Sequence, residues 1–223
     1  MNLYRGIYWF GSASFNKKVK TIRNEVVLNG INQFSTPILT NNPETNISFN
    51  GTFSKKIYGF KIELNPELSW FTYYQNLNSI ETINNQKSQN IGLLFKTAYR
   101  KWPSFSIEYK KGFSQFDGIT NSNYKTDAII SDFEHSFLKS WTLKFDYENL
   151  KNTNENNQTN FFELVNASLS YQKKNSPLIF ELIANNIFDI KKKNDFSFSD
   201  YFISEQSTFI LPRVLMISVS YKL

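Results

Sequence analysis

The sequence predicts an all-β fold, an antiparallel up-and-down meander, and three observations support it. Apolar and polar residues alternate repeatedly with a period of two, whereas helical periodicity is hard to find. Turn-forming segments separate the alternating stretches. No apolar run approaches the ~20 residues that a membrane-spanning helix needs. We therefore expect one domain of strands, residues 1–223.

Each predicted strand is an alternating stretch, and the clearest is residues 141–150, where tryptophan, leucine, phenylalanine and tyrosine alternate with threonine, lysine, aspartate and glutamate. The first two strands alternate least, because residues 18–29 are charged. Pro66 has no N–H for the ladder, so we expect a bulge or a local break there. The predicted strands, in order, are residues 3–15, 19–31, 45–55, 60–75, 89–100, 104–117, 125–138, 141–150, 160–173, 178–190 and 208–222.

The connections between these strands alternate between short and long. Short connections indicate tight turns between neighbouring antiparallel strands. An outer-membrane β-barrel has this layout, with short periplasmic turns and long extracellular loops. The sequence thus predicts a transmembrane β-barrel in the outer membrane. The short connections are residues 55–59, 101–103, 138–140 and 174–177, and the long ones are 32–44, 76–87, 118–123, 151–159 and 191–207.

The strand lengths and count extend this prediction. Most predicted strands exceed the ~9 to 11 residues that a tilted strand needs to cross a bilayer. Bacterial single-chain barrels have even strand numbers and both chain ends on the periplasmic side. About eleven strands is an odd count, which places Leu3 at the extracellular rim. We therefore expect a partial barrel, the C-terminal part of a larger one.

Composition excludes several classes of function. The 25 Lys and Arg against 19 Asp and Glu give a net charge of +6, spread thinly, so we expect no nucleic-acid partner. The chain has no cysteine, which excludes a disulfide scaffold, a cysteine-ligated metal site and a thiol nucleophile. One histidine, His135, is too few for a typical imidazole metal site. We expect neither a metal nor a cofactor.

Two C-terminal segments resemble the TonB-dependent outer-membrane receptors, especially the Asn- and Lys-rich versions from Bacteroidetes-like bacteria. Residues 184–189 are similar to the family's "N-L-F-(N/D)" segment, and residues 211–223 are similar to its closing strand, which begins "P-R" and ends in an aromatic-x-hydrophobic pattern. The final residue, Leu223, departs from the common Phe or Trp, and the plug domain and energy-coupling box are absent. The residues that carry the motifs are Asn186, Phe188, Asp189, Pro212 and Arg213.

The resemblance implies a function and partners. It implies energy-coupled uptake of a scarce solute, with the TonB system acting through a plug domain that this sequence lacks. The closing strand's Val219, Tyr221 and Leu223 would be the signal that the barrel-assembly machinery recognises, by adding a strand to its sheet edge. Outer-membrane lipid and an unidentified small solute or peptide ligand complete the expected partners.

Other residues are assigned simpler roles. Trp102 and Trp141 lie beside short turns and are expected to be interfacial aromatics on the periplasmic side. Charged residues such as Lys61 and Glu63 are expected to pair in the barrel lumen. We expect no catalytic residue and no enzyme, because residues 112–116, the nearest approach to a nucleophile elbow, lack the second glycine.

The alternatives to a receptor barrel are a complete small barrel acting as a passive porin or adhesin, an outer-membrane lipase or protease using His135, and a soluble β-sandwich.

Overall fold

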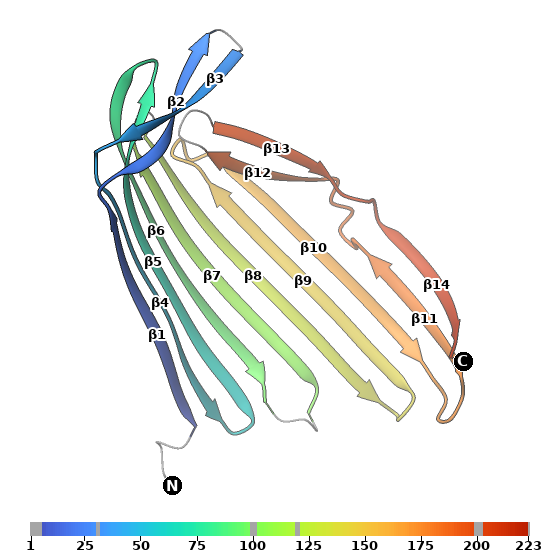
Figure 1. Ribbon diagram of the computed structural model, residues 1–223. Coiled ribbons are helices and arrows are strands. Elements are labelled where there is room, and N and C mark those ends of the chain that lie inside the picture. Colours follow the sequence, from blue (N-terminus) through green and yellow to red (C-terminus); the bar gives the residue numbers. More distant parts are fainter. Residues whose placement is uncertain (1–5, 30–31, 99–101, 119–120, 199–202, 223) are drawn as a thin grey trace.

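The protein is all-β, as the sequence predicts. The computed structural model describes residues 6–29, 32–98, 102–118, 121–198 and 203–222, and within them it contains fourteen strands and no helix (Figure 1). The strands are β1 (Ile7–Lys18), β2 (Thr21–Asn29), β3 (Asn32–Thr40), β4 (Glu44–Ile57), β5 (Phe60–Leu77), β6 (Ile80–Thr97), β7 (Ser104–Asp117), β8 (Ser122–Phe137), β9 (Trp141–Thr153), β10 (Thr159–Tyr171), β11 (Leu178–Asn185), β12 (Lys192–Phe198), β13 (Ile203–Phe209) and β14 (Val214–Tyr221).

Most of the strands form one antiparallel up-and-down sheet, here termed the wall, in the order β1-β4-β5-β6-β7-β8-β9-β10-β11-β14. Two hairpins are inserted into this meander, β2–β3 between β1 and β4, and β12–β13 between β11 and β14 (Figure 1). The first hairpin joins the wall through a short parallel contact, in which Glu25 pairs with Asn76 and Val26 with Leu77. Among the described residues, β1 and β14 are the two edges of the wall and do not pair with each other.

β1 begins and β14 ends at the rim that carries the tight turns, here termed the turn rim. Ile7 at the start of β1 pairs with Lys55, beside the two-residue turn Tyr58–Gly59. Tyr221 at the end of β14 pairs with Leu178, beside the turn that follows β10. Figure 1 shows the start of β1 and the end of β14 at this rim. The opposite rim carries the two inserted hairpins and is termed the hairpin rim.

The prediction of eleven strands is wrong, because the described residues contain fourteen, ten of them in the wall. Ten is an even number, and β1 begins at the same rim at which β14 ends. The odd strand count that placed residue 3 at the opposite rim is therefore not found. Leu3 itself lies outside the described residues.

Three of the predicted long loops are also wrong. Residues 32–44 contain β3, residues 191–207 contain β12 and most of β13, and residues 76–87 are the paired ends of β5 and β6 around the turn Asn78–Ser79. These segments are rich in polar residues, so period-two alternation is missing although the backbone ladder continues. The alternation therefore detects only the parts of strands that have one apolar face.

The register of the wall separates its apolar and polar residues onto opposite faces. Successive side chains of a strand point to opposite sides, and paired residues share a side. One row of paired residues on the apolar face is Phe105, Phe133, Phe145, Ala167, Ala184 and Leu215. A row on the polar face is Lys96, Ser106, Asp132, Asp146 and Asn166.

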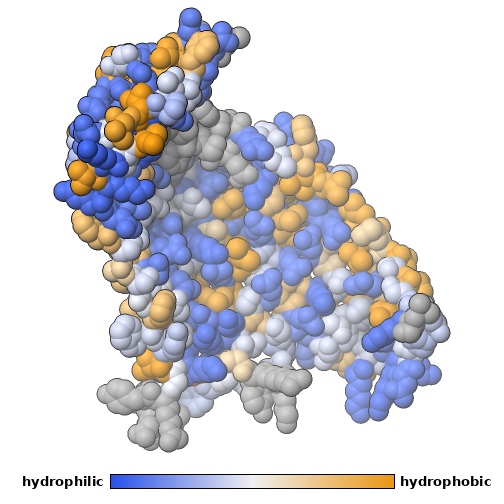
Figure 2. Space-filling model, viewed as in Figure 1, coloured by the Kyte–Doolittle hydropathy of each residue, from blue (hydrophilic) through white to orange (hydrophobic). Residues whose placement is uncertain are grey.

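The wall is a single layer. Among the described residues, only six apolar side chains are buried, Val26, Tyr73, Phe116, Ala128, Phe162 and Val165, and no second sheet covers the apolar face. Ile217 is 83% exposed and Trp9 is 71% exposed on this face. Figure 2 shows the other side of the wall, where hydrophilic residues predominate over the central strands.

Pro66 interrupts one ladder, as predicted. Pairing of β4 with β5 reaches Phe53 opposite Leu64, stops, and resumes with Asn50 opposite Glu67 in the same register. No residue is inserted, so the feature is a local break and not a bulge. Pro66 keeps its partner Ile91 on the β6 side.

Gly118 is expected to be the glycine that tolerates a side chain least. A Cβ there would lie 1.9 Å from Oδ1 of Asn84, and Asn84 cannot move aside because it is fully buried and donates a hydrogen bond to the side chain of Gln75. Replacing Gly118 with alanine should lower the free energy of unfolding by about 1–3 kcal/mol. Urea unfolding followed by tryptophan fluorescence measures this. Gly11→Ala is the control, because its nearest contact is 3.5 Å away, and equal losses in the two variants would contradict the prediction.

Candidate functional site

The two motif segments that carry the family resemblance meet in the structure. Asn186 follows β11 and is only 3% exposed. Its Nδ2 donates hydrogen bonds to the carbonyl oxygens of Ile190 and Leu211, both at 2.8 Å, and its Oδ1 accepts one from the Ile190 amide at 2.9 Å. The Asn186 amide in turn donates to Oδ1 of Asn166 in β10. Asn186 thereby fixes both the start and the return of the β12–β13 hairpin.

A second motif residue completes this clamp. Oδ1 of Asp189 accepts a hydrogen bond of 3.0 Å from the amide of Arg213, which directly precedes β14. Pro212 and Phe188 are exposed, with no equivalent role. Asn186 and Asp189 both have positive φ, 51° and 55°, a conformation that Asn and Asp adopt more readily than other non-glycine residues. The structure thus gives Asn186 and Asp189 a structural role, which is to close the inserted hairpin and pair β14 with β11.

Aromatic rings line the turn rim, and Trp102 and Trp141 belong to them. Trp102 packs edge-on against Phe60 with ring centroids 5.1 Å apart, and Trp141 lies 4.9 Å from Tyr171. His135 lies on the apolar face between the rings of Phe133 and Phe137, at 6.4 and 6.0 Å. These neighbours supply no group that would activate a catalytic histidine.

The closing strand carries the predicted assembly residues on its apolar face. Val219 pairs with Phe180 and Tyr221 pairs with Leu178, and both are exposed at the edge of the wall. Leu223 lies outside the described residues.

Ion pairs cross the polar face of the wall. Nζ of Lys61 lies 2.9 Å from Oε1 of Glu63, which confirms the predicted pair, and Lys96 approaches the same oxygen at 3.0 Å. Farther along the face, Lys110 lies 3.2 Å from Glu108. These three lysines and two glutamates leave a net charge of only +1 among them.

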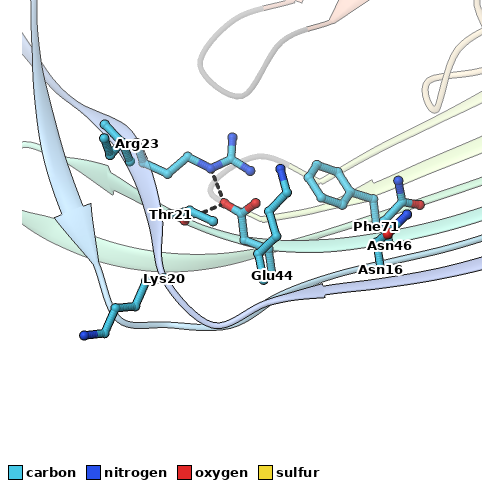
Figure 3. A pocket seen from close by; sticks show the side chains of 9 residues that line it. Asn16, Lys20, Thr21, Arg23, Glu44, Asn46 and Phe71 are labelled. Atoms are coloured by element: carbon cyan, nitrogen blue, oxygen red, sulfur yellow. Dashed lines mark hydrogen bonds and ion pairs between the residues drawn. The ribbon is translucent and has the colours of Figure 1, made fainter.

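At the hairpin rim the polar face has a cavity of about 760 Å³, here termed the β1–β2 pocket (Figure 3). It forms because β4 pairs with β1, so that Glu44 is opposite Lys18, while the chain turns sharply from β1 into β2 and brings Arg23 to Glu44. The lining residues are Asn16, Lys18, Lys20, Thr21, Ile22, Arg23, Glu44, Asn46 and Phe71.

Arg23 is held in place from several sides. Glu44, 6% exposed, forms an ion pair with Nε of Arg23 and accepts a hydrogen bond of 3.1 Å from the Thr21 hydroxyl. The guanidinium carbon lies 4.6 Å from the ring centroid of Tyr73 and 5.8 Å from that of Phe71. Such contacts of a cation with ring faces are attractive. The planar group is therefore preorganised at the pocket wall.

The pocket carries an excess of positive charge. Lys18 and Arg23 line it against one carboxylate, Glu44, which is already paired with Arg23. Lys20 also borders the pocket, but in Figure 3 its side chain points away from the other labelled side chains. Within the described part of the chain, Lys18 and Lys20 form no ion pair, and no three His, Cys, Asp or Glu side chains gather as a metal site. The arrangement suits binding of an anion.

Sequence reasoning did not single out the β1–β2 pocket. The signal present was the charged stretch 18–29, which weakened the strand prediction and was not treated as a site. Glu44, the ion-pair partner of Arg23, lies nineteen residues beyond Glu25 in the sequence. Only the pairing of β4 with β1 brings Glu44 to Arg23.

Comparisons with known proteins give no family. No protein-family model matches the chain, and no curated protein matches its sequence. In the ranges that the structure describes, no helix is long and apolar enough to cross a membrane.

Proposed function

We propose that the chain is the wall of an outer-membrane β-barrel, belonging to a TonB-dependent receptor that takes up a scarce solute. The observation that carries the proposal is the one-sided sheet: ten strands share a continuous apolar face on one side and an ion-paired, hydrogen-bonded face on the other. In a transmembrane barrel these two faces meet lipid and the aqueous lumen.

The energetics of the apolar face support lipid contact. Burying one large apolar side chain is worth about 1.5–3 kcal/mol, and this face exposes many of them. A soluble monomer rarely leaves so large an apolar surface in water. A β-sandwich would cover the apolar face with a second sheet. The second sheet among the described residues, β12–β13, contacts the polar face instead, where Lys193 reaches Glu148 and Phe162.

Two further features support the membrane and its partners. The aromatic rings along the turn rim, including Trp102 and Trp141, fit the girdle that marks a membrane interface. The exposed edge of β14, with Val219 and Tyr221, fits strand addition to the barrel-assembly machinery. The receptor class and the TonB partner rest on the resemblance of residues 184–189 and 211–223.

A second candidate is a smaller barrel that acts as a passive porin or adhesin. One observation favours it: the wall has ten strands, an even number, and its edge strands β1 and β14 run in opposite directions from the same rim. Two edge strands that run in opposite directions can form an antiparallel ladder with each other, and each can also pair with a further strand.

An immunoblot of outer membranes from the source organism tests these proposals, using an antibody to residues 151–159. A band in the outer-membrane fraction several-fold larger than 26.2 kDa is expected for the receptor. A band near 26.2 kDa in that fraction would favour the small barrel. Recovery of the protein in the soluble fraction would overturn the membrane proposal.

A further inference from the structure

We propose that the β1–β2 pocket binds a small organic anion that carries hydroxyl groups, of the kind that an acidic saccharide provides. The inference deepens the proposed function by naming the chemistry of a solute, and it rests on that function only for the role of uptake. Its grounds are the charge, the polar lining and the ring of the pocket.

The charge of the lining selects an anion. Lys18 lines the cavity without an ion-pair partner in the described ranges and is exposed to solvent. Lys20 borders the cavity too, but its side chain points away from the other lining side chains in Figure 3 and adds only to the positive charge nearby. Arg23 uses Nε for Glu44, and its two terminal nitrogens have no other hydrogen-bond partner among the described residues. A guanidinium fork of this kind binds a carboxylate with two parallel hydrogen bonds.

The rest of the lining suits hydroxyl groups. Asn16 and Asn46 are paired residues of β1 and β4 on the polar face, and within the described residues their side-chain amides make no hydrogen bond. Each amide offers two donors and one acceptor, so it can serve a hydroxyl in either role. Phe71 lies beside them in Figure 3 and presents a ring to the cavity. A purely inorganic anion would leave both the amides and the ring unused.

The size and place of the pocket fit a small solute. A volume of about 760 Å³ lies within the ~300–1,000 Å³ of typical ligand pockets. The pocket is on the polar face and at the rim opposite the tight turns, which is the extracellular end in the proposed orientation. A second cavity on the same face, lined by Glu67, Glu108 and Lys110, contains opposite charges in closer balance and gives no comparable preference.

Titration calorimetry on the refolded full chain in detergent micelles tests the inference. The probes are trigalacturonate, its fully methyl-esterified form, and triaspartate. We expect trigalacturonate to bind, the uncharged ester to bind at least about tenfold more weakly, and triaspartate, which has carboxylates but no hydroxyls, to bind more weakly as well. Equal binding of the ester would overturn the anion preference, and tighter binding of triaspartate would overturn the saccharide chemistry in favour of an acidic peptide.

Matched lysine variants locate the site. Lys18→Gln is expected to weaken trigalacturonate binding about tenfold. Lys17→Gln is the control, because Lys17 neighbours Lys18 in sequence but its register places it on the opposite face of β1, and it should change affinity less than twofold. Equal losses in both proteins would overturn the assignment to this pocket. Both variants change exposed side chains, and circular dichroism checks their fold.

The outcome is separable from that of the proposed function. Calorimetry in micelles does not depend on transport or on the TonB system. A chain that fractionates with the outer membrane but does not bind trigalacturonate would overturn only this inference. A chain that is soluble without detergent and still binds trigalacturonate would overturn only the membrane proposal.

Discussion

Replacing Leu93 with lysine is expected to lower the free energy of unfolding in lipid vesicles by about 2–4 kcal/mol, the cost of a charge on the lipid face near the bilayer midplane. Leu93 lies in β6 on the apolar face, between Leu64 and Tyr109, and is 48% exposed. Urea unfolding of the chain folded into vesicles measures the change.

The adjacent residue gives a matched control. Leu94 is on the polar face of β6, where its partners are Glu63 and Glu108, so a lysine there finds carboxylates nearby. Leu94→Lys is expected to cost less than about 1 kcal/mol. If the two variants lose equal stability, the apolar face does not face lipid and the proposed orientation of the wall is wrong.

Replacing Asn186 with alanine is expected to lower the free energy of unfolding by about 3 kcal/mol. The substitution removes three side-chain hydrogen bonds and leaves the Leu211 and Ile190 carbonyls without these donors in a buried place. It also puts alanine at a φ of 51°, which adds about 1 kcal/mol. Denaturant unfolding measures the loss, and proteolysis of the β12–β13 hairpin reports whether the clamp has opened.

Asn185 is the control for this variant. It has the same side chain and directly precedes Asn186, but within the described residues its side chain makes no hydrogen bond. Asn185→Ala is expected to change stability by less than about 0.5 kcal/mol. Protection of the hairpin that is unchanged in Asn186→Ala would show that the clamp is not needed.

The fold class could be predicted from the sequence because the central part of each wall strand has one apolar face. Residues 141–148 alternate cleanly, and the strand found there runs from Trp141 to Thr153. The strand count could not be predicted in the same way, because β3, β12 and the outer half of β6 carry polar residues in succession. Their backbone pairing has no signature in a single sequence.

The candidate site was harder to predict than the fold. The pair of Lys61 and Glu63 lies two residues apart on one strand, so their shared face follows from sequence spacing alone. Arg23 belongs to β2 of the inserted hairpin and Glu44 to β4 of the wall, and their contact depends on the pairing of β4 with β1. The clamp at Asn186 likewise joins two segments whose motifs were recognised separately.

The two inserted hairpins also bear on the order in which the chain folds. Within the central wall, each strand pairs with the next one along the chain, so only short loops need to close and folding can proceed by successive hairpins. Pairing of β1 with β4 and of β11 with β14 instead closes loops that contain a whole hairpin, which carries a larger entropic cost. Prior formation of β2–β3 and β12–β13 shortens those loops. We therefore expect the edges of the wall to form last, with β4 to β11 as the early folding unit.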